Sequence, residues 1–481
     1  MDGKYVMAID GGTQSMKVLI VDFQGRVVSE GQRELQPTIA PKLGYVEHPG
    51  DDLWDSLIVA CKKAMAGFPG KKEEIVAVGL CTIRSCRVYL RKDGSLAYPV
   101  IDWMDNRAFG PFVFPTTDSV YATTTTGYMT HRLTGQFRDT VANCTNRAWP
   151  TDMDHWRWTD DDGVFRSYQL KREQMMELCM PGSVLGCVTK EAAEVTGIPA
   201  GIPVIATAND KAVEALGTGL SLQKETGMVT LGTYISSMIC GTENRQNTNC
   251  FWTNFASVPY QYLYESFGIR RGMWTVSWLK NLIGDEVALK AKKEGISSET
   301  YLDREAASVP AGSEGLLTVV EWLGAKGLEF KKGVMLGFDV RHSRAHMYRS
   351  IMEGIAFTMK NLYTAMCDEL GVKPKKIIVS GGGSSGNAFM QIFADMFGVP
   401  AYRNEMNGAA GLGSAICAAV GVGVYKSFDE AAQAMVRTKD EFAPDETNHA
   451  LYSKINEDVY RDITRTTDVV LKKSYPIFNR F

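Results

Sequence analysis

Two glycines and a set of hydrogen-bonding side chains follow a short apolar strand near the start of the chain. Residues 7–17 read MAIDGGTQSMK, with Asp10 at the end of the strand and Thr13, Gln14 and Lys17 beyond or beside the glycines. Glycine lets backbone N–H groups approach an anion closely, and these side chains add donors and positive charge, so a phosphate site is one interpretation. A plain β-hairpin is the other, because strand-like runs lie on both sides of FQGR. The stretch matches neither standard glycine-rich nucleotide motif and does not decide by itself.

Three later stretches carry the same kinds of residues. GIPVIATAND ends on Asp210 at the exit of a buried strand, Gly232 and Thr233 form a turn between strands, and Gly381–Gly383 precede a helix. Taken singly, each is typical of a helix cap or a turn. Together they predict two backbone anion sites on opposite walls of one cleft, with a third glycine loop beside them. One aspartate can then bind Mg²⁺ between phosphates while another takes a proton from an attacking hydroxyl, as phosphoryl transfer requires.

The elements that must position these residues repeat once along the chain. The opening predicts three strands, YVMAI, MKVLIVDF and GRVVSEGQREL, then a helix over DDLWDSLIVACKKAMAGF and a buried strand, EIVAVGLCTI. TGMVTLGTYISSMICGT, from residue 226, repeats the strand–turn–strand opening. The stretch 408–423 consists of small residues, so we expect that helix to pack directly against another backbone. The pattern predicts an α/β fold of two domains, residues 1–220 and 221–481, with a cleft between them.

Composition narrows the partners. The 481 residues include 52 Lys and Arg against 55 Asp and Glu, and this near balance argues against a nucleic-acid partner held by a basic surface. No apolar run approaches the ~20 residues of a membrane helix, and MDGKYVMAID has no basic region followed by an apolar core, so we expect neither a membrane partner nor a secretion signal. Ten cysteines without a Cys-x-x-Cys pair and six histidines without metal-ligand spacing favour a reduced, cytoplasmic location.

In this order and combination, the motifs resemble the FGGY family of carbohydrate kinases, within the actin-like ATPase superfamily. The resemblance implies two ribonuclease H-like domains around a cleft. It spans nearly the whole chain, and the segment 333–354 follows the family pattern most closely, with Phe338 where a smaller aliphatic residue is usual. The stretches that carry it are DGGTQSMK (10–17), GYVEHP (44–49), WMDNRA (103–108), YMTHRLTG (128–135), ANDKAVEALGTG (208–219), LGT (231–233), GVMLGFDVRHSRAHMYRSIMEG (333–354), GGGSSGNAFMQIFADMFG (381–398) and GAAGLGSAICAAVG (408–421).

The resemblance also implies an activity and a site. The activity is ATP-dependent phosphorylation of a hydroxyl group on a small sugar, polyol or sugar acid, with ATP and Mg²⁺ as cofactors. Asp210 corresponds to the catalytic base and Asp10 to the carboxylate near the metal. The positions implied for binding are Gly12, Thr13, Gln14 and Lys17 (first phosphate loop), Gly232 and Thr233 (second phosphate loop), Gly382, Gly383 and Asn387 (adenosine), and Arg84, Trp103 and Asp105 (substrate).

Two departures from the family pattern concern the substrate pocket. The chain is shortened between residues 108 and 128 and lacks a helix that relatives carry there, so we expect either a lost pocket wall or a missing segment. Ser85 stands where relatives have a charged or imidazole side chain, which leaves Arg84 as the main polar contact, suited to vicinal hydroxyls or a sugar-acid carboxylate. Arg270 and Arg271 either favour an acidic sugar or form a solvated helix end.

Alternatives stay open at this point. Trp103 is as well explained by core packing as by substrate contact. A bare ATPase that closes on protein partners, or a catalytically impaired homologue that acts as a regulator, would use the same fold. The intact Asp10, Asp210 and glycine loops favour the kinase, and a homodimer is the default expectation for an enzyme of this size.

Overall fold

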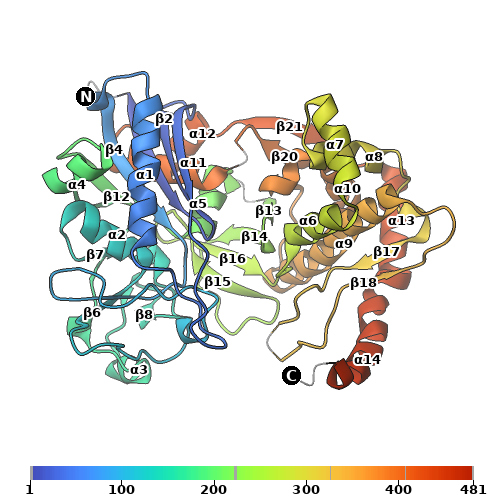
Figure 1. Ribbon diagram of the computed structural model, residues 1–481, viewed down its shortest axis with the longest axis horizontal. Helices are drawn as coiled ribbons and strands as arrows, with labels where there is room; N and C mark the ends of the chain where they lie inside the picture. Colours follow the sequence, from blue (N-terminus) through green and yellow to red (C-terminus); the bar gives the residue numbers. More distant parts are fainter. Residues whose placement is uncertain (1–3, 221–224, 326, 407, 479–481) are drawn as a thin grey trace.

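The computed structural model describes residues 4–220, 225–325, 327–406 and 408–478. The domain boundary predicted between residues 220 and 221 therefore falls at the edge of an undescribed segment. Two large sheets lie side by side, the first at the left and the second in the centre and right of Figure 1. Each has helices on its faces, which is the architecture expected of an α/β chain with a duplicated opening.

Six strands form the first sheet. In spatial order they are β11 (Val184–Cys187), β12 (Pro203–Ala206), β4 (Ile75–Thr82), β1 (Tyr5–Gly11), β2 (Ser15–Asp22) and β3 (Val27–Glu34). β1, β2 and β3 form an antiparallel meander, whereas β4 is parallel to β1 and β12 is parallel to β4. The hairpin and the buried strand predicted from the sequence are thus confirmed.

Seven strands form the second sheet, with the same strand directions at its centre. In spatial order they are β15 (Phe251–Phe255), β16 (Tyr262–Ser266), β14 (Ile235–Gly241), β13 (Thr226–Leu231), β19 (Lys376–Ser380), β20 (Ala401–Asn404) and β21 (Thr438–Phe442). β13, β14 and β16 repeat the three adjacent antiparallel strands, although β15 comes between β14 and β16 in the chain, and β19 and β20 repeat the two parallel strands. The repeat makes this a pair of ribonuclease H-like units in an actin-like arrangement.

Both faces of β1 are buried, and alternate residues of the strand belong to two different hydrophobic cores. Met7 and Ile9 belong to a core shared with α1 (Asp52–Gly67), whereas Val6 and Ala8 belong to a core shared with α11 (Ala409–Gly421) and α12 (Phe428–Met435). Figure 1 shows α11 and α12, drawn in orange, beside the blue strands of the first sheet. The C-terminal half of the sequence therefore supplies the layer that covers the N-terminal sheet, and β1 is apolar from Val6 to Ile9 because both of its faces are covered there.

The helix of small residues lies directly against another helix, as predicted. α5 (Asp210–Gly217) follows β12 just as α11 follows β20, and the two helices pack together. A Cβ added at Gly413 of α11 would overlap the carbonyl oxygen of Val213, and one at Gly217 of α5 would overlap that of Ala409. The two backbones touch because these positions carry no side chain.

The segment between β4 and β12 forms its own small core. It contains β5 (Val88–Leu90), β6 (Tyr121–Thr123), α2 (Thr125–Thr134) and β7 (Arg138–Thr140). The shortened region packs onto this core: Phe112 is buried, and Arg87 donates to the carbonyl oxygens of Gly110 and Pro111 while its guanidinium lies 3.6 Å from the centre of the Phe112 ring. The region between residues 108 and 128 is therefore a folded wall of the molecule.

The other helices and strands complete the layers. They are β8 (Thr151–Asp152), β9 (Arg157–Trp158), α3 (Asp162–Ser167), β10 (Glu177–Cys179), α4 (Lys190–Thr196), α6 (Gly272–Leu282), α7 (Asp285–Glu294), α8 (Ser298–Ala307), β17 (Leu317–Val319), β18 (Val334–Leu336), α9 (Arg344–Leu370), α10 (Asn387–Phe397), α13 (Glu446–Ile455) and α14 (Arg461–Phe478). Within the described ranges, no helix is both long enough and apolar enough to cross a membrane.

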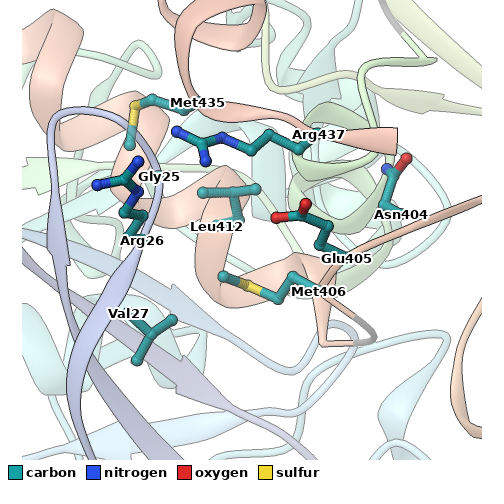
Figure 2. A pocket seen from close by; sticks show the side chains of 9 residues that line it. All are labelled: Gly25, Arg26, Val27, Asn404, Glu405, Met406, Leu412, Met435 and Arg437. Carbon is teal, nitrogen blue, oxygen red and sulfur yellow. The ribbon is translucent and has the colours of Figure 1, made fainter. Parts of the chain in front are cut away.

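A surface pocket of about 320 Å³ marks where the chain crosses between the sheets (Figure 2). One crossing follows β20 and the other precedes β21, and they are joined by a hydrogen bond of 3.0 Å from the Glu405 N–H to the Arg437 carbonyl. The turn between β2 and β3, at Gly25, closes the pocket from the first sheet. No residue predicted for the active site lines this pocket.

Candidate active site

Asp10 and Asp210 lie at the same edge of the first sheet. Asp10 is the penultimate residue of β1, and Asp210 is the first residue of α5, just beyond β12. Since β1, β4 and β12 are parallel, their carboxyl ends meet at one edge, where ligands collect in α/β folds. Burial, and then the charges of Asp210 and Glu214, raise the pKa of Asp10 to about 7, although Lys17 and Lys211 act in the opposite direction.

Asp210 has a carboxylate oxygen with no hydrogen-bond partner among the described residues. Its Oδ1 atom is buried and accepts no hydrogen bond from the residues that the structure describes. The nearest cationic atom is Nε of Arg84, 4.0 Å away. Asn209 caps α5 by accepting from the N–H groups of Lys211 and Ala212, which fixes the start of the helix and with it the position of Asp210. An unsatisfied buried acceptor is uncommon, and here it suits a group that accepts a proton from a ligand.

Glu214 and Lys211 belong to the same cluster, although the sequence analysis did not select them. Glu214 Oε1 accepts from Thr230 Oγ at the end of β13 (2.8 Å) and from Ser380 Oγ at the end of β19 (2.9 Å). Lys211 Nζ lies 3.2 Å from Glu214 Oε2. The spacing of four residues between Asp210 and Glu214, which places both on one helix face, was the available signal. Through Glu214, α5 joins the catalytic edge of the first sheet to the strand ends of the second.

The two predicted phosphate loops are equivalent hairpin turns, one in each sheet. In the first, the Gly12 N–H donates to the Ser15 carbonyl (3.0 Å), and Gln14 is exposed. In the second, the carbonyls of Gly232 and Thr233 accept from the first N–H groups of α6, at 3.1 and 2.8 Å. Both turns are hairpins, so the two interpretations of MAIDGGTQSMK are compatible.

Lys17 follows the first of these turns on β2. Its Nζ atom lies 3.4 Å from Glu30 Oε2, and its charge acts on Asp10. The side chain is one-third exposed, so the ammonium group remains accessible to a ligand at the turn.

The glycine loop before α10 combines a strained position with an open one. Gly381 has φ +86°, and a Cβ there would lie 2.6 Å from the Leu231 carbonyl oxygen, so only glycine fits. Gly382 is the opposite, because a Cβ there would meet no atom within 4 Å. Asn387 Oδ1 accepts from Arg403 Nη2 (2.8 Å), so the amide N–H₂ group is available for the predicted adenosine contact.

The neighbouring Gly383 is closely packed, and Arg403 holds the rest of the loop in place. A Cβ at Gly383 would lie 2.8 Å from the Leu231 side chain. Arg403 Nη1 donates to the carbonyls of Ser384 and Ser385. The open face at Gly382 is thus held rigidly by its surroundings.

Arg84 pairs with a carboxylate from the other half of the chain. Its two terminal nitrogens donate to Glu265 of β16 at 2.6 and 2.9 Å, in bidentate geometry. Burial alone would raise the pKa of Glu265, but the charge and hydrogen bonds of Arg84 lower it to about 2. Ser85 has φ +63°, a left-handed conformation that non-glycine residues adopt only under constraint. The predicted main substrate contact is therefore also a link between the two halves, with its Nε edge toward Asp210.

Both carboxylate oxygens of Asp105 accept hydrogen bonds from the protein. Its Oδ2 accepts from the Val46 N–H (2.6 Å) and from Arg107 Nη2 (2.7 Å), and its Oδ1 accepts from Nε and the backbone N–H of Arg107. Glu47 also accepts from Arg107. The carboxylate predicted to contact substrate thus joins GYVEHP to WMDNRA, and it is buried with both oxygens occupied.

Trp103 lies in the same turn as Asp105, and its indole N–H is an unused hydrogen-bond donor among the described residues. Its indole N–H is buried and finds no acceptor among the described residues. On one side Asp102 accepts from the Met104 N–H (2.9 Å) and lies 3.1 Å from His48 Nε2, and on the other side Asp105 anchors the turn. The indole also packs against the core around α1, so core packing and a free donor coexist in this residue.

Of the two arginines before α6, neither meets a carboxylate in the described ranges. Arg270 Nη1 donates to the Gly324 carbonyl (3.1 Å), and the Arg271 guanidinium lies 4.8 Å from the centre of the Trp274 ring. Arg270 is exposed. Arg270, which is exposed and bound to a backbone carbonyl, fits a solvated helix end, and the acidic-sugar alternative stays a prediction.

Comparisons with known proteins give a consistent family. Models of the N-terminal and C-terminal domains of the FGGY family of carbohydrate kinases match residues 5–112 with 119–217, and residues 227–422. A curated relative, "Uncharacterized sugar kinase YgcE" of Escherichia coli (strain K12), is 45% identical over 479 residues, which cover 100% of this chain and 97% of the relative.

Solved structures agree with the fold. A ligand-bound xylulose kinase from Lactobacillus acidophilus has a TM-score of 0.83 at 18% identity, covering 98% of this chain and 99% of that one. A gluconate kinase from the same organism has a TM-score of 0.82 at 18% identity, with the same coverage. These two likenesses concern the fold. The two kinases are named for different substrates, so they do not indicate the acceptor of the present chain.

Proposed function

The chain belongs to the FGGY family of carbohydrate kinases, and we propose that it phosphorylates a hydroxyl group of a small sugar, polyol or sugar acid with Asp210 as the general base. It is accordingly a phosphotransferase that acts on an alcohol group and uses ATP with Mg²⁺. The observation that carries the assignment of the base is the Asp210 Oδ1 atom, which is buried, without a hydrogen-bond partner, and beside Arg84. A carboxylate in that state is ready to take the proton of an incoming hydroxyl.

Asp10 supports the proposed metal position. Its pKa of about 7 reflects burial next to two other carboxylates, an arrangement that a divalent cation relieves. Asp10 would hold the metal, which would supply neutralisation of phosphate charge at this edge of the sheet. Lys17 and Lys211 add positive charge on the protein side.

The nucleotide has a matching set of positions. The turns at Gly12–Gln14 and Gly232–Thr233 would hold phosphate oxygens, and the open face at Gly382 with Gly383 and Asn387 would hold the adenosine portion. The carbonyls of the second turn are already satisfied by α6, which leaves the N–H side of that turn for an anion.

The acceptor would lie between Trp103, Arg84 and Asp210. The free indole N–H of Trp103 would donate to a hydroxyl, and Arg84 would orient the acceptor while Asp210 takes its proton. Closing the two halves over the site excludes water, so that the sugar hydroxyl receives the phosphate. A regulator without activity has no use for a buried carboxylate oxygen kept unpaired, and this favours the enzyme over the impaired homologue.

A coupled assay for ADP formation tests the proposal directly. The purified chain is supplied with Mg²⁺ and ATP and with a panel of ketoses, aldoses, alditols and aldonates. We expect ADP formation that depends on both Mg²⁺ and one class of acceptor. ADP formation that no acceptor changes would identify a bare ATPase instead, and ATP binding without turnover on any acceptor would favour a regulator.

A further inference from the structure

Arg147 is a cation that has no anionic partner among the residues that the structure describes. Its guanidinium carbon lies 4.9 Å from the centre of the Trp252 ring and 5.8 Å from that of Phe109. Trp252 belongs to β15 of the second sheet, whereas Phe109 belongs to the shortened region of the first half. Among the described residues, none forms a hydrogen bond or an ion pair with Arg147, and its side chain is exposed. The residue therefore stands between the two halves with its donors unused.

A short series of contacts connects Arg147 to the proposed base. The indole N–H of Trp252 donates to Glu265 Oε2 (2.9 Å), and the same oxygen accepts from Arg84 Nη1 (2.6 Å). Arg84 in turn places its Nε atom 4.0 Å from Asp210 Oδ1. Arg147 is thus connected to Asp210 through contacts with Trp252, Glu265 and Arg84 in turn.

Other arginines of the candidate site are neutralised or engaged. Arg84 is paired with Glu265, Arg107 with Glu47 and Asp105, and Arg270 donates to a carbonyl. Arg147 therefore carries a charge that the surrounding protein does not balance.

The contact with Trp252 prepares Arg147 for an anion. A guanidinium that lies against aromatic rings can still donate its N–H groups to the two oxygens of a carboxylate, and no described residue accepts from those of Arg147. The ring contacts also limit the rotamers of the long side chain, which lowers the entropy lost on binding.

We propose that Arg147 binds a carboxylate of the acceptor, so that the substrate is a sugar acid with its acid group at Arg147 and a hydroxyl at Asp210. This inference rests on the proposed kinase function and names the substrate class for it. It moves the anion contact away from Arg84, whose terminal nitrogens are occupied by Glu265. The shortened region contributes Phe109, whose ring centre lies 5.8 Å from the Arg147 guanidinium carbon.

Matched acceptor pairs and one substitution test the inference. Steady-state kinetics with Mg²⁺ and ATP are measured for aldonates of four to six carbons, for the alditols of the same configuration, and for the corresponding sugar phosphates. We expect an aldonate to be the best acceptor, and Arg147→Met to raise its KM about tenfold or more with kcat and the KM for ATP nearly unchanged. Arg147→Lys should restore part of the loss, because a single ammonium keeps the charge without the bidentate contact.

Arg270→Met is the matched control. Arg270 is an exposed arginine whose charge acts on Tyr234, as that of Arg147 does, so its removal reports any general effect of local charge. Thermal unfolding checks that both variants remain folded. A preference for the alditol, a preference for the sugar phosphate, or an unchanged aldonate KM in Arg147→Met would each overturn the carboxylate assignment while leaving the kinase intact. Turnover on no acceptor would instead overturn the proposed function, and this inference with it.

Discussion

At the scale of single residues, the site depends on carboxylates kept in costly environments. Asp10 is surrounded by other acids, and Asp210 keeps a buried oxygen unpaired. Asp10, whose pKa is raised by burial and by its neighbouring carboxylates, is a shifted group of the kind that clusters at functional sites. By contrast Asp105, of the same residue type, has four donors, and those from Arg107 and Val46 outweigh the effect of burial and hold its pKa below the usual value. The comparison separates carboxylates that wait for a ligand from one that holds the fold.

Asp10 should make the Mg²⁺-free protein less stable as the pH rises. Because its pKa is raised to about 7 from the ordinary 3.8, the native state holds a proton that the unfolded chain has lost, so stability falls between about pH 4 and pH 7. Asp10→Asn cannot ionise, and we expect it to be more stable than the parent by ~1–3 kcal/mol at pH 8, with the difference vanishing toward pH 4. Urea unfolding without Mg²⁺ at several pH values measures this. Parallel pH profiles for the two proteins would contradict it.

At the scale of elements, glycines play two different parts. Those between α5 and α11 let two backbones touch, and Gly381 adopts a conformation that other residues resist. Gly382, one position later, has neither a steric nor a conformational need within the fold. An open glycine on a rigid loop is what the close approach of a ligand requires.

Alanine substitutions at the adjacent Gly381 and Gly382 should separate the structural role of a glycine from its ligand-binding role. Gly381→Ala should lower the thermal midpoint by several degrees, because its φ of +86° and its distance of 2.6 Å from the Leu231 carbonyl both oppose a Cβ. Gly382→Ala should leave the midpoint nearly unchanged and raise the KM for ATP by roughly tenfold, because the methyl group would occupy the nucleotide face. Thermal unfolding and ATP kinetics on both variants measure the split. Equal effects on stability would argue against a ligand role for Gly382.

Much of the structure at the scale of elements could be predicted from the sequence. The strands, both hairpin turns and the backbone contact of the small-residue helix follow from apolar periodicity and glycine spacing. The roles of Arg84 and Asp105 were less accessible, because their partners are decided by tertiary structure: Glu265 lies 181 positions after Arg84, and Val46 lies 59 before Asp105. Arg147 sits in an irregular segment, where no periodicity marks a side chain as functional.

At the scale of the whole molecule, the two halves are tied at the site itself. Arg84 extends from the end of β4 to Glu265 on β16, and Glu214 extends from α5 to Thr230 and Ser380 at the ends of β13 and β19. The chain crossings near Glu405 and Arg437 form a separate connection around the pocket in Figure 2. Any movement that opens or closes the site must act on these contacts.

Removing the buried partner of Arg84 should weaken the link between the halves. Glu265→Gln leaves Arg84 without its anion, and we expect the free energy of unfolding to fall by about 2–4 kcal/mol, as for other broken buried ion pairs. Glu299→Gln, which removes a largely exposed partner of Lys280, should change it by less than ~1 kcal/mol. Chemical denaturation of both variants makes the comparison, and equal small losses would show that the Arg84–Glu265 pair does not stabilise the fold.

The most direct test of the central claim is the turnover of Asp210→Asn with its best acceptor. Asparagine keeps the size of the side chain but cannot take a proton, so we expect kcat to fall by roughly a thousandfold or more while the affinity for Mg²⁺-ATP stays within a few-fold. Asp462→Asn, at an exposed aspartate on α14, is the control and should retain full activity. Loss of turnover with nucleotide binding preserved is the predicted result. Turnover by Asp210→Asn close to that of the parent would show that another group acts as the base.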